Sequence, residues 1–398
     1  MSALQGRSTP FGLLLLVLAF LSVLSASVAA DDPPTPNDRV VRTQSRWNLL
    51  ELRDPAGAVS TIDDAETWGE RRQLIVAAAE SVMGPFERAS VTGSSRVLLK
   101  SRESLGSVVR FELLIEIEPS DELPVTVHLP TRFAGNVMPS DDVIDVARLF
   151  RAEAPRLPLA LALHPTDDHL GRLTIVRSTD ESPTLGYAFE MAERGWLTVA
   201  PAYPRLADYR PDLDRLGYRS GTMKSIRNGS RLLDLLIGTG HVDEERIAAI
   251  GHSLGGHSSV YVAVFDERID AVVSCCGLDA FVDYYRGDRS VWQLGRGWCT
   301  DRYMPRLVDY ADDLEAIPFD FPELIGALAP RPVLIIAPLR DDNFRADSVD
   351  RIADSARPVY SLFGAAERLE VRHPDEAHDF SPDMRRAAYE WLDRQLSD

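Results

Sequence analysis

The sequence predicts an α/β protein in which a mostly parallel central sheet carries helices on both faces. From residue 157 onwards, short apolar runs alternate with segments whose apolar residues recur at helical spacing, which is the pattern of β–α–β units. The runs are apolar nearly throughout, as expected for strands covered on both faces. A glycine-flanked serine joins one of these runs to the helix that follows it. The chain should therefore bring distant loops together at one edge of the sheet.

The individual elements of this region follow from length and spacing. Strands are assigned to short apolar runs, and helices to segments with apolar residues three or four positions apart. The expected strands are Leu157–Leu163, Trp196–Ala200, Arg246–Gly251, Ile269–Cys275, Pro332–Ala337 and Leu369–Arg372. The expected helices carry Leu185 to Ala192, Met223 to Ile237, Leu254 to Phe265 and Met384 to Leu392.

The chain before residue 157 divides into three parts. Residues 1–30 read as a signal peptide, residues 31–107 as an N-terminal arm with a helix over residues 64–83, and the main domain covers residues 108–398. The main domain begins with two runs of strand character, Val108–Glu118 and Leu123–Leu129, separated by a short polar loop. That arrangement favours a β-hairpin.

The signal peptide rests on the order of its parts. Arg7 precedes an apolar stretch from Phe11 to Leu24, and small residues lead to Ala30, after which the chain becomes acidic and proline-rich. This order is typical of a cleaved export signal; an uncleaved anchor is the alternative, because residues 11–30 are just long enough to span a bilayer. We therefore expect a secreted or periplasmic protein without stable membrane insertion after cleavage.

The formal charge of the chain is 43 − 61 = −18. A surface this acidic repels phosphate backbones and anionic lipids, so nucleic acid is not an expected partner. Three cysteines, Cys275, Cys276 and Cys299, are too few for a disulfide-built scaffold. In an exported protein one of the first two would be able to pair with Cys299, and only one, because neighbouring strand residues point to opposite faces.

Residues 279–322 interrupt the alternation of strands and helices. The segment is rich in aromatic residues, has little helical periodicity and lies between two core strands, so we interpret it as an insertion over a functional site. The alternative is a surface excursion that packs on its own aromatic residues. Its aromatic residues include Phe281, Tyr284, Tyr285, Trp292, Trp298, Tyr303 and Tyr310.

The strongest functional signal is Gly251-His252-Ser253-Leu254-Gly255. A serine hydroxyl becomes a useful nucleophile only when it is exposed on a tight turn and has a base beside it. Crowding in a strand-to-helix turn permits only small residues two positions either side of the serine, and Gly251 and Gly255 meet that condition. Ser253 is therefore the predicted nucleophile.

The base and the acid are sought later in the chain, because this motif orders its triad as serine, acid, histidine. Of the eight histidines, His378 lies in a loop before the last helix, whereas His373 ends a strand and is expected to be structural. The acid should follow the strand Pro332–Ala337, where Asp341 is preferred and Asp342 is the alternative. Asp279, after the preceding strand, is a weaker candidate.

The oxyanion hole requires two backbone N–H groups. Leu254 follows the nucleophile and supplies one of them. The loop after Leu157–Leu163 supplies the other, and because Pro165 has no N–H, Thr166 is the expected donor. The two His and two Asp residues of segment 164–169 fit a polar loop at a sheet edge as well as a metal site, so no metal is assigned. No phosphate-binding or dinucleotide motif is present, and no cofactor is expected.

Together these segments resemble the bacterial α/β-hydrolases, and within them the branch of dienelactone hydrolases, acetyl-xylan esterases and prolyl-oligopeptidase-like enzymes. The resemblance runs from about residue 120 to the end of the chain and is specific at the serine motif and the histidine loop. The matching segments are His164-Pro165-Thr166, Ala200-Pro201-Ala202-Tyr203-Pro204, Gly217-Tyr218, Ser220-Gly221-Thr222-Met223-Lys224, Gly251 to His257, Ala329-Pro330-Arg331-Pro332 and Ala377-His378-Asp379-Phe380.

The resemblance implies a Ser253-Asp341-His378 triad and small-molecule esters as the default substrates. Two departures concern the pocket. Related enzymes often have His-Gly or His-Gln where this chain has His164-Pro165, and they often have Pro-Asp-Tyr where this chain has Pro201-Ala202-Tyr203. Dienelactone hydrolases also use a cysteine where this chain has Ser253. The rival hypotheses are a prolyl-oligopeptidase-like peptidase, for which no propeller domain is visible, and a catalytically silent binding module.

Overall fold

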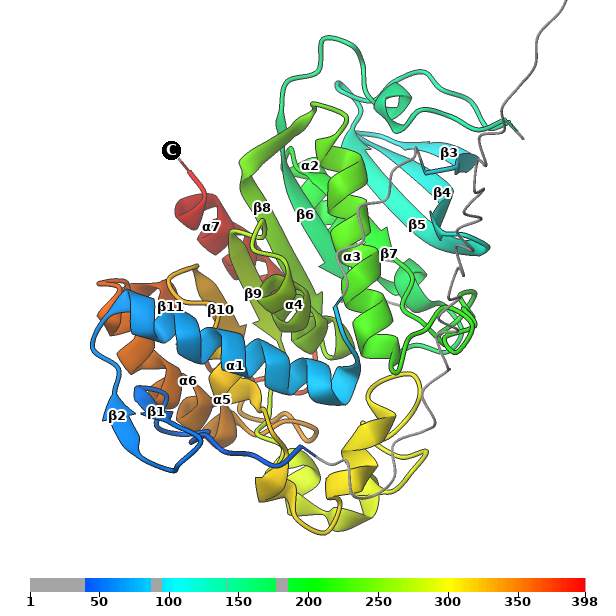
Figure 1. The fold of residues 1–398 in the computed structure, drawn as a ribbon. Helices are drawn as coiled ribbons and strands as arrows, with labels where there is room; N and C mark the ends of the chain where they lie inside the picture. Colours follow the sequence, from blue (N-terminus) through cyan, green and yellow to red (C-terminus); the bar gives the residue numbers. More distant parts are fainter. Residues whose placement is uncertain (1–39, 87–94, 141, 177–184, 398) are drawn as a thin grey trace, which may run out of the picture. The chain divides into compact units, whose positions relative to one another are not determined.

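The computed structural model describes residues 40–86, 95–140, 142–176 and 185–397. The predicted signal peptide therefore lies outside the described residues. The structure contains a nine-stranded sheet in the order β11-β10-β9-β8-β6-β7-β5-β4-β3 and a separate β1-β2 pair (Figure 1). The strands are β1 (Glu51–Arg53), β2 (Val59–Thr61), β3 (Val97–Leu105), β4 (Val108–Glu118), β5 (Asp121–Pro130), β6 (Leu157–Leu163), β7 (Leu197–Pro201), β8 (Val242–His252), β9 (Ala271–Cys275), β10 (Val333–Ile336) and β11 (Leu369–Arg372).

Seven α-helices accompany the sheet among the described residues. They are α1 (Ala65–Met83), α2 (Tyr187–Glu193), α3 (Gly221–Ile237), α4 (Leu254–Phe265), α5 (Phe321–Gly326), α6 (Ala346–Leu362) and α7 (Pro382–Gln395). Short 3-10 helices are η2 (Val146–Leu149), η3 (Gly171–Ile175), η4 (Tyr284–Gly287), η5 (Arg289–Trp292), η6 (Pro305–Tyr310), η7 (Leu314–Ala316) and η8 (Ala366–Arg368).

The six strands from β11 to β7 are parallel, and β5, β4 and β3 continue the sheet in antiparallel pairing. The prediction of a mostly parallel α/β sheet is therefore confirmed, as is the hairpin, whose arms β4 and β5 meet at a turn with Glu118 opposite Asp121. Because parallel strands all end at the same edge, β6, β8, β9 and β10 deliver the loops that follow them to one place.

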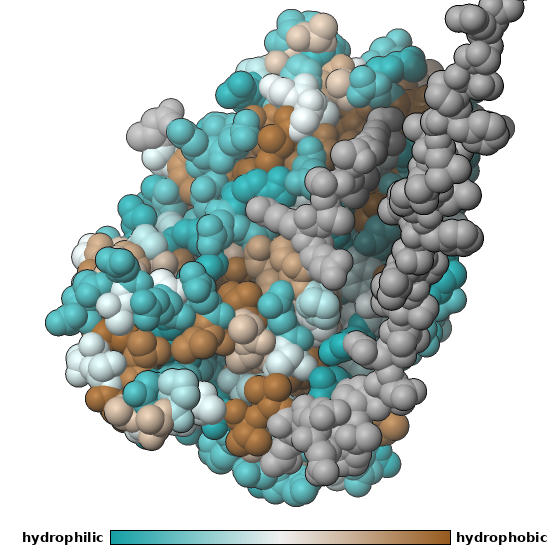
Figure 2. Space-filling model, in the orientation of Figure 1, coloured by the Kyte–Doolittle hydropathy of each residue, from teal (hydrophilic) through white to brown (hydrophobic). Residues whose placement is uncertain are grey.

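Two separate hydrophobic cores show that both faces of the sheet are covered. Along β8, Ile247 and Ala249 belong to one core, whereas Ala248 and Ile250 belong to the other, as alternation along a strand requires. The first core includes residues of α1, α3, α4, α5 and α6, and the second includes residues of α2 and α7 (Figure 1). The surface in Figure 2 is mostly hydrophilic, with apolar residues in separate patches.

The N-terminal segment departs from the sequence prediction at one boundary. β3 lies inside the predicted arm of residues 31–107, yet it pairs with β4 as the last strand of the large sheet. The sheet thus begins at Val97, not at residue 108. By contrast, α1 matches the predicted helix: Asp64 caps its first turn by accepting from the Thr67 N–H, and Gly84, at φ 99°, follows its last residue.

The three cysteines are free thiols, so no bridge to Cys299 forms. The expectation that Cys275 and Cys276 point to opposite faces is wrong, because β9 ends at Cys275 and Cys276 has φ 51°. Their sulfur atoms lie 3.7 Å apart and both contact the carbonyl of Asp379. No helix among the described residues is long and apolar enough to cross a membrane.

Candidate active site

Ser253 occupies a sharp turn between β8 and α4. Its backbone has φ 56° and ψ −117°, a conformation that costs a non-glycine residue about 1–3 kcal/mol. The turn also requires its glycines: a Cβ on Gly251 would lie 2.3 Å from the backbone of Gly255, and a Cβ on Gly255 would lie 1.8 Å from the Leu163 oxygen. The serine is held by its N–H, which donates to the Cys275 carbonyl at 2.9 Å.

The structure brings His378 to this serine across 125 residues of sequence. Nε2 of His378 lies 3.0 Å from Ser253 Oγ, and Nδ1 lies 2.9 and 3.0 Å from the two carboxylate oxygens of Asp341. Since Asp341 can only accept, Nδ1 carries a proton, and in the neutral imidazole Nε2 is free to accept the serine proton. Such an arrangement can activate a serine for nucleophilic attack, because the base is oriented by the carboxylate.

Asp341 itself is fixed by two further donors, the N–H groups of Asn343 and Phe344, at 2.8 and 3.0 Å. Burial opposes ionisation of this carboxyl, but the bonds from His378 and from these amides hold its pKa below the ordinary value. Asp342, the alternative acid, is exposed. Asp279 is buried, and burial raises its pKa to about 8; the described partners of the His378 ring nitrogens do not include it.

His378 is more basic than an ordinary histidine. Burial lowers its pKa, but the Asp341 carboxylate and the Cys276 thiol outweigh that effect and raise the pKa to about 10. Only the neutral imidazole accepts the serine proton. We therefore expect kcat/KM for an ester to keep rising with pH above the ordinary histidine pKa of about 6.5.

This expectation is checked by measuring kcat/KM between about pH 6 and about pH 10, which spans the ordinary and the raised pKa of a histidine. Two controls are needed: an ester substrate that is stable in alkali, and a thermal unfolding scan of the protein at each pH. A profile that is already flat at neutral pH would contradict the raised pKa of His378.

The two predicted oxyanion donors lie at the same pocket as the serine. Leu254 is the first residue of α4, so its N–H has no partner within the helix. The loop that carries Thr166 is anchored by His164, which donates from Nδ1 to the Pro165 carbonyl and accepts the Tyr203 N–H at Nε2. Both nitrogens of His164 are thereby used, which leaves neither free for the metal site considered in segment 164–169.

The aromatic insertion forms one wall of this pocket and is tied to the Thr166 loop. Thr166 Oγ1 lies 2.9 Å from the Tyr303 hydroxyl, and Arg302 forms an ion pair with Asp168 at 2.7 Å. The pocket has a volume of about 500 Å³. It is lined by Pro165, Thr166, Asp167, Thr174, Leu185, His252, Ser253, Leu254, His257, Tyr284, Tyr285, Trp298, Tyr303, Asn343, Phe344 and His378.

Several of these residues were not identified from the sequence as site residues. Asn343 and Phe344 follow the acid and were not considered, and Tyr303 was noted only as one of the insertion's aromatic residues. His252 was expected to point back into the fold; it is buried, but its ring lies 4.9 Å from that of His378. His373 has the structural role predicted for it, with its ring bonded to the Ala337 carbonyl and to Asp350.

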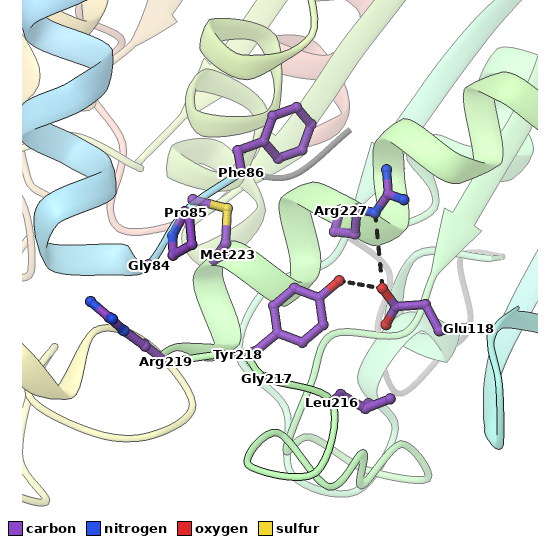
Figure 3. Close-up of a pocket in the computed structure, with 10 residues that line it drawn as sticks. All are labelled: Gly84, Pro85, Phe86, Glu118, Leu216, Gly217, Tyr218, Arg219, Met223 and Arg227. Atoms are coloured by element: carbon purple, nitrogen blue, oxygen red, sulfur yellow. Dashed lines mark hydrogen bonds and ion pairs between the residues drawn. The ribbon is translucent and has the colours of Figure 1, made fainter. Parts of the chain in front are cut away.

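A second pocket, of about 260 Å³, lies at the end of α1 and the start of α3 and shares no lining residue with the first. Figure 3 shows Tyr218 and Arg227 both directed at Glu118. Glu118, Tyr218 and Arg227 are therefore engaged with one another, and they do not form a nucleophile and base pair.

Known proteins similar to this chain share its fold. The glucuronoyl esterase of Solibacter usitatus is 17% identical and superposes with a TM-score of 0.66, covering 90% of this chain and 99% of that one. The carbohydrate esterase family 15 glucuronoyl esterase of Caldicellulosiruptor kristjansonii is 18% identical, with a TM-score of 0.61 and coverage of 89% and 91%. These likenesses show the α/β-hydrolase fold.

Sequence comparison adds the reaction class. The family model described as glucuronyl esterase, fungi, matches residues 227–364, which include Ser253 and Asp341. Carbohydrate esterase MZ0003, from an unknown prokaryotic organism, is 28% identical over 125 residues, 31% of this chain and 29% of that protein. The chain is a carboxylic-ester hydrolase with the α/β-hydrolase fold. These similarities agree with the hydrolase branch that the sequence motifs resemble.

Proposed function

We propose that the protein is an exported serine esterase that cleaves esters of carbohydrate carboxylic acids through an acyl-enzyme. The observation that carries the mechanism is the unbroken chain of contacts from Ser253 Oγ to His378 and from His378 to Asp341, all within 3.0 Å. Export rests on the signal-peptide pattern of residues 1–30.

The reaction proceeds in two acyl-transfer steps. His378 Nε2 accepts the proton of Ser253 as Oγ attacks the ester carbonyl, and the N–H groups of Leu254 and Thr166 stabilise the oxyanion. The imidazolium then protonates the leaving alcohol, which departs and leaves the acyl group on Ser253. A water molecule deprotonated by His378 attacks this acyl-enzyme and releases the acid. Asp341 stabilises the imidazolium in both steps.

The pocket lining favours an uncharged ester over a charged substrate. The described lining contains Tyr284, Tyr285, Trp298 and Tyr303 on one wall and no Arg or Lys. Aromatic side chains offer an apolar face with a polar tip, which suits a ring that has both C–H faces and hydroxyl groups. The acid product carries a negative charge in a protein of formal charge −18, so its release is electrostatically favoured. The names of the glucuronoyl esterase relatives point to uronic acid esters.

A substrate panel with active-site labelling tests the proposal. We expect benzyl glucuronate to be cleaved with a higher kcat/KM than p-nitrophenyl acetate, and a prolyl peptide amide not to be cleaved. A fluorophosphonate probe should label Ser253, as located by mass spectrometry. Cleavage of the peptide amide in preference to esters would favour the peptidase hypothesis, and a folded protein without a label would favour the binding module.

Tyr285 provides a test of the aromatic wall. It lines the pocket with a side chain that is 45% exposed, so Tyr285→Ala removes a contact surface without opening the core. We expect KM for benzyl glucuronate to rise roughly 3- to 10-fold with kcat little changed, from the loss of about 0.5–1.5 kcal/mol of aromatic contact. Leu294→Ala, 71% exposed in the same insertion, is the matched control. Equal effects of both variants would argue against a substrate contact.

A further inference from the structure

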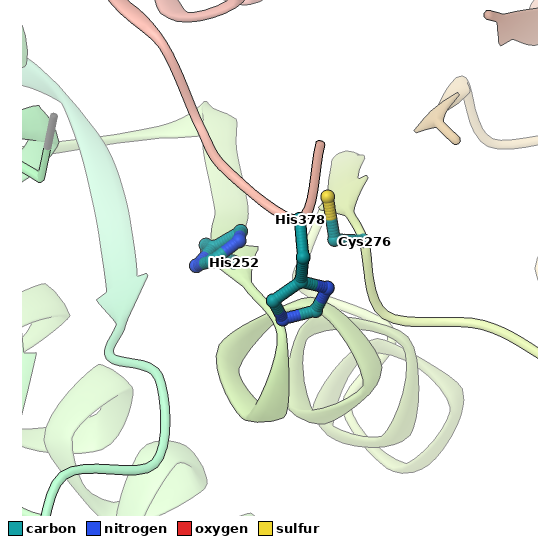
Figure 4. Close-up of side chains that lie close together, drawn as sticks. All are labelled: His252, Cys276 and His378. Carbon is teal, nitrogen blue, oxygen red and sulfur yellow. The ribbon is translucent and has the colours of Figure 1, made fainter. Parts of the chain in front are cut away.

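Three side chains of types that can bind metals meet next to the nucleophile, since one of them, His378, contacts Ser253. His252 ends β8, Cys276 follows β9, and His378 lies in the loop between β11 and α7. One nitrogen or sulfur atom from each lies within 4.8 Å of the other two. Figure 4 shows the His378 ring between His252 and Cys276. The sequence does not suggest this group, because its members are separated by 24 and 102 residues.

Sheet register and one unusual backbone conformation create the group. β8 and β9 pair with His252 opposite Cys275, so residue 276 begins one position beyond the paired ends. There the chain takes φ 51°, a left-handed conformation that is uncommon for a residue other than glycine and often marks a functional site. The turn directs the Cys276 thiol toward the histidine loop, where Sγ lies 3.3 Å from the Asp379 carbonyl.

His252 supplies an independent observation that points to a ligand. Its residue is only 5% exposed, and neither ring nitrogen has a hydrogen-bond partner among the described residues. Buried polar groups are bonded in the great majority of cases, so an exception calls for an explanation such as an ion. His252 also lines the pocket that contains Ser253, which gives a cation a route from solvent.

We propose that His252, Cys276 and His378 bind one zinc ion, which keeps the esterase inactive until the ion is removed. Two imidazole nitrogens and a thiolate are a characteristic ligand set for zinc, with water as the fourth ligand. In a tetrahedral site, bonds of about 2.0–2.3 Å place the ligand atoms about 3.3–3.8 Å apart. Side-chain rotations that close the present separations by about 1 Å would therefore complete the site.

Zinc binding by these three side chains changes no oxidation state. The Cys276 thiol loses its proton to solvent, the sulfur forms a bond to zinc, and each imidazole gives one lone pair. A neutral imidazole has a single free lone pair, and in the metal-free enzyme that of His378 faces Ser253. Coordination removes this base from the serine. The inhibitory effect rests on the proposed catalytic role of His378, whereas the metal site itself does not.

Binding and inhibition are measured separately on the full chain after treatment with a chelator. Equilibrium dialysis with Zn²⁺ should give one ion per chain, and Co²⁺ should give the thiolate charge-transfer absorption of a cysteine-bound metal. Cys276→Ser and His252→Gln should each weaken Zn²⁺ binding at least about tenfold, which is the scale of affinity loss caused by substitutions around a metal site. Cys299→Ser, which removes a buried thiol outside the group, should bind as the unchanged protein does.

Activity is then compared within each variant, with and without Zn²⁺. The unchanged enzyme should lose activity in proportion to occupancy and recover it on addition of the chelator. Ser253→Ala, although inactive, should still bind the ion, so a failure of the catalytic proposal is distinguishable from a failure of the metal site. Absence of a bound ion, or full-strength binding by both Cys276→Ser and His252→Gln, would overturn the proposal.

Discussion

Replacing Ser253 by alanine is expected to lower kcat for ester hydrolysis by roughly 10⁶-fold, the scale found when a triad serine is removed. In the proposed mechanism the variant loses the atom that forms the acyl bond, while the proposed oxyanion donors and the pocket stay in place. Its fold should be nearly as stable as before, because the change removes one hydrogen bond with His378, worth about 0.5–1.5 kcal/mol. Esterase assays and thermal unfolding of the purified variant measure both effects.

Ser258→Ala is the matched control for this prediction. Ser258 lies on α4, the helix that begins directly after Ser253; it is buried and has a hydroxyl with no hydrogen-bond partner among the described residues, so its loss should leave kcat near the original value. Ser253→Gly is informative in the other direction: it should be as inactive as the alanine variant but relieve the positive φ, and so be more stable than Ser253→Ala. Substantial turnover by either Ser253 variant would refute the acyl-enzyme mechanism.

The regular parts of the fold were predictable because they are encoded locally. β6 and β10 are apolar runs whose limits follow closely from composition, and α1 carries its own cap and stop at Asp64 and Gly84. β8 begins at Val242, four residues before the predicted start at Arg246; the prediction missed its first part because that part is charged and only the later part is an apolar run. β3 was missed because only its first residues are buried and the rest alternate with charged side chains, as befits the last strand of a sheet. α6 was missed although it has a buried face, since its polar composition and Pro358 weaken the helical signal.

The site was predictable to the extent that it rests on motifs. Ser253 is identified by its flanking glycines, and His378 and Asp341 by their order after particular strands. The sequence could not provide proximity. The contact between the His252 and His378 rings, whose planes meet at 48°, the left-handed turn at Cys276 and the Tyr303–Thr166 contact all depend on how separate loops pack. Insertions without periodicity carry no local signal for such contacts.

Replacing Asp341 by asparagine is expected to lower kcat by about 10⁴-fold, as when a triad carboxylate becomes an amide. The amide can donate to His378 Nδ1, which favours the tautomer with its proton on Nε2. In that tautomer Nε2 donates to Ser253 Oγ and cannot accept the serine proton. The loss of charge also lowers the His378 pKa, because the carboxylate is a main cause of its elevation. The residual activity should therefore reach its plateau at a lower pH than that of the unchanged enzyme.

Asp342→Asn separates this role from a general effect of charge in the loop. Asp342 is adjacent but exposed, so we expect kcat within about twofold of the original, as for surface substitutions that change stability by less than about 0.5 kcal/mol. Strong loss in Asp342→Asn with an active Asp341→Asn would transfer the acid role to Asp342. Asp279 is the weakest substitute, because burial raises its pKa to about 8. At neutral pH it is mostly protonated, and a neutral carboxyl cannot stabilise the His378 imidazolium as a carboxylate does.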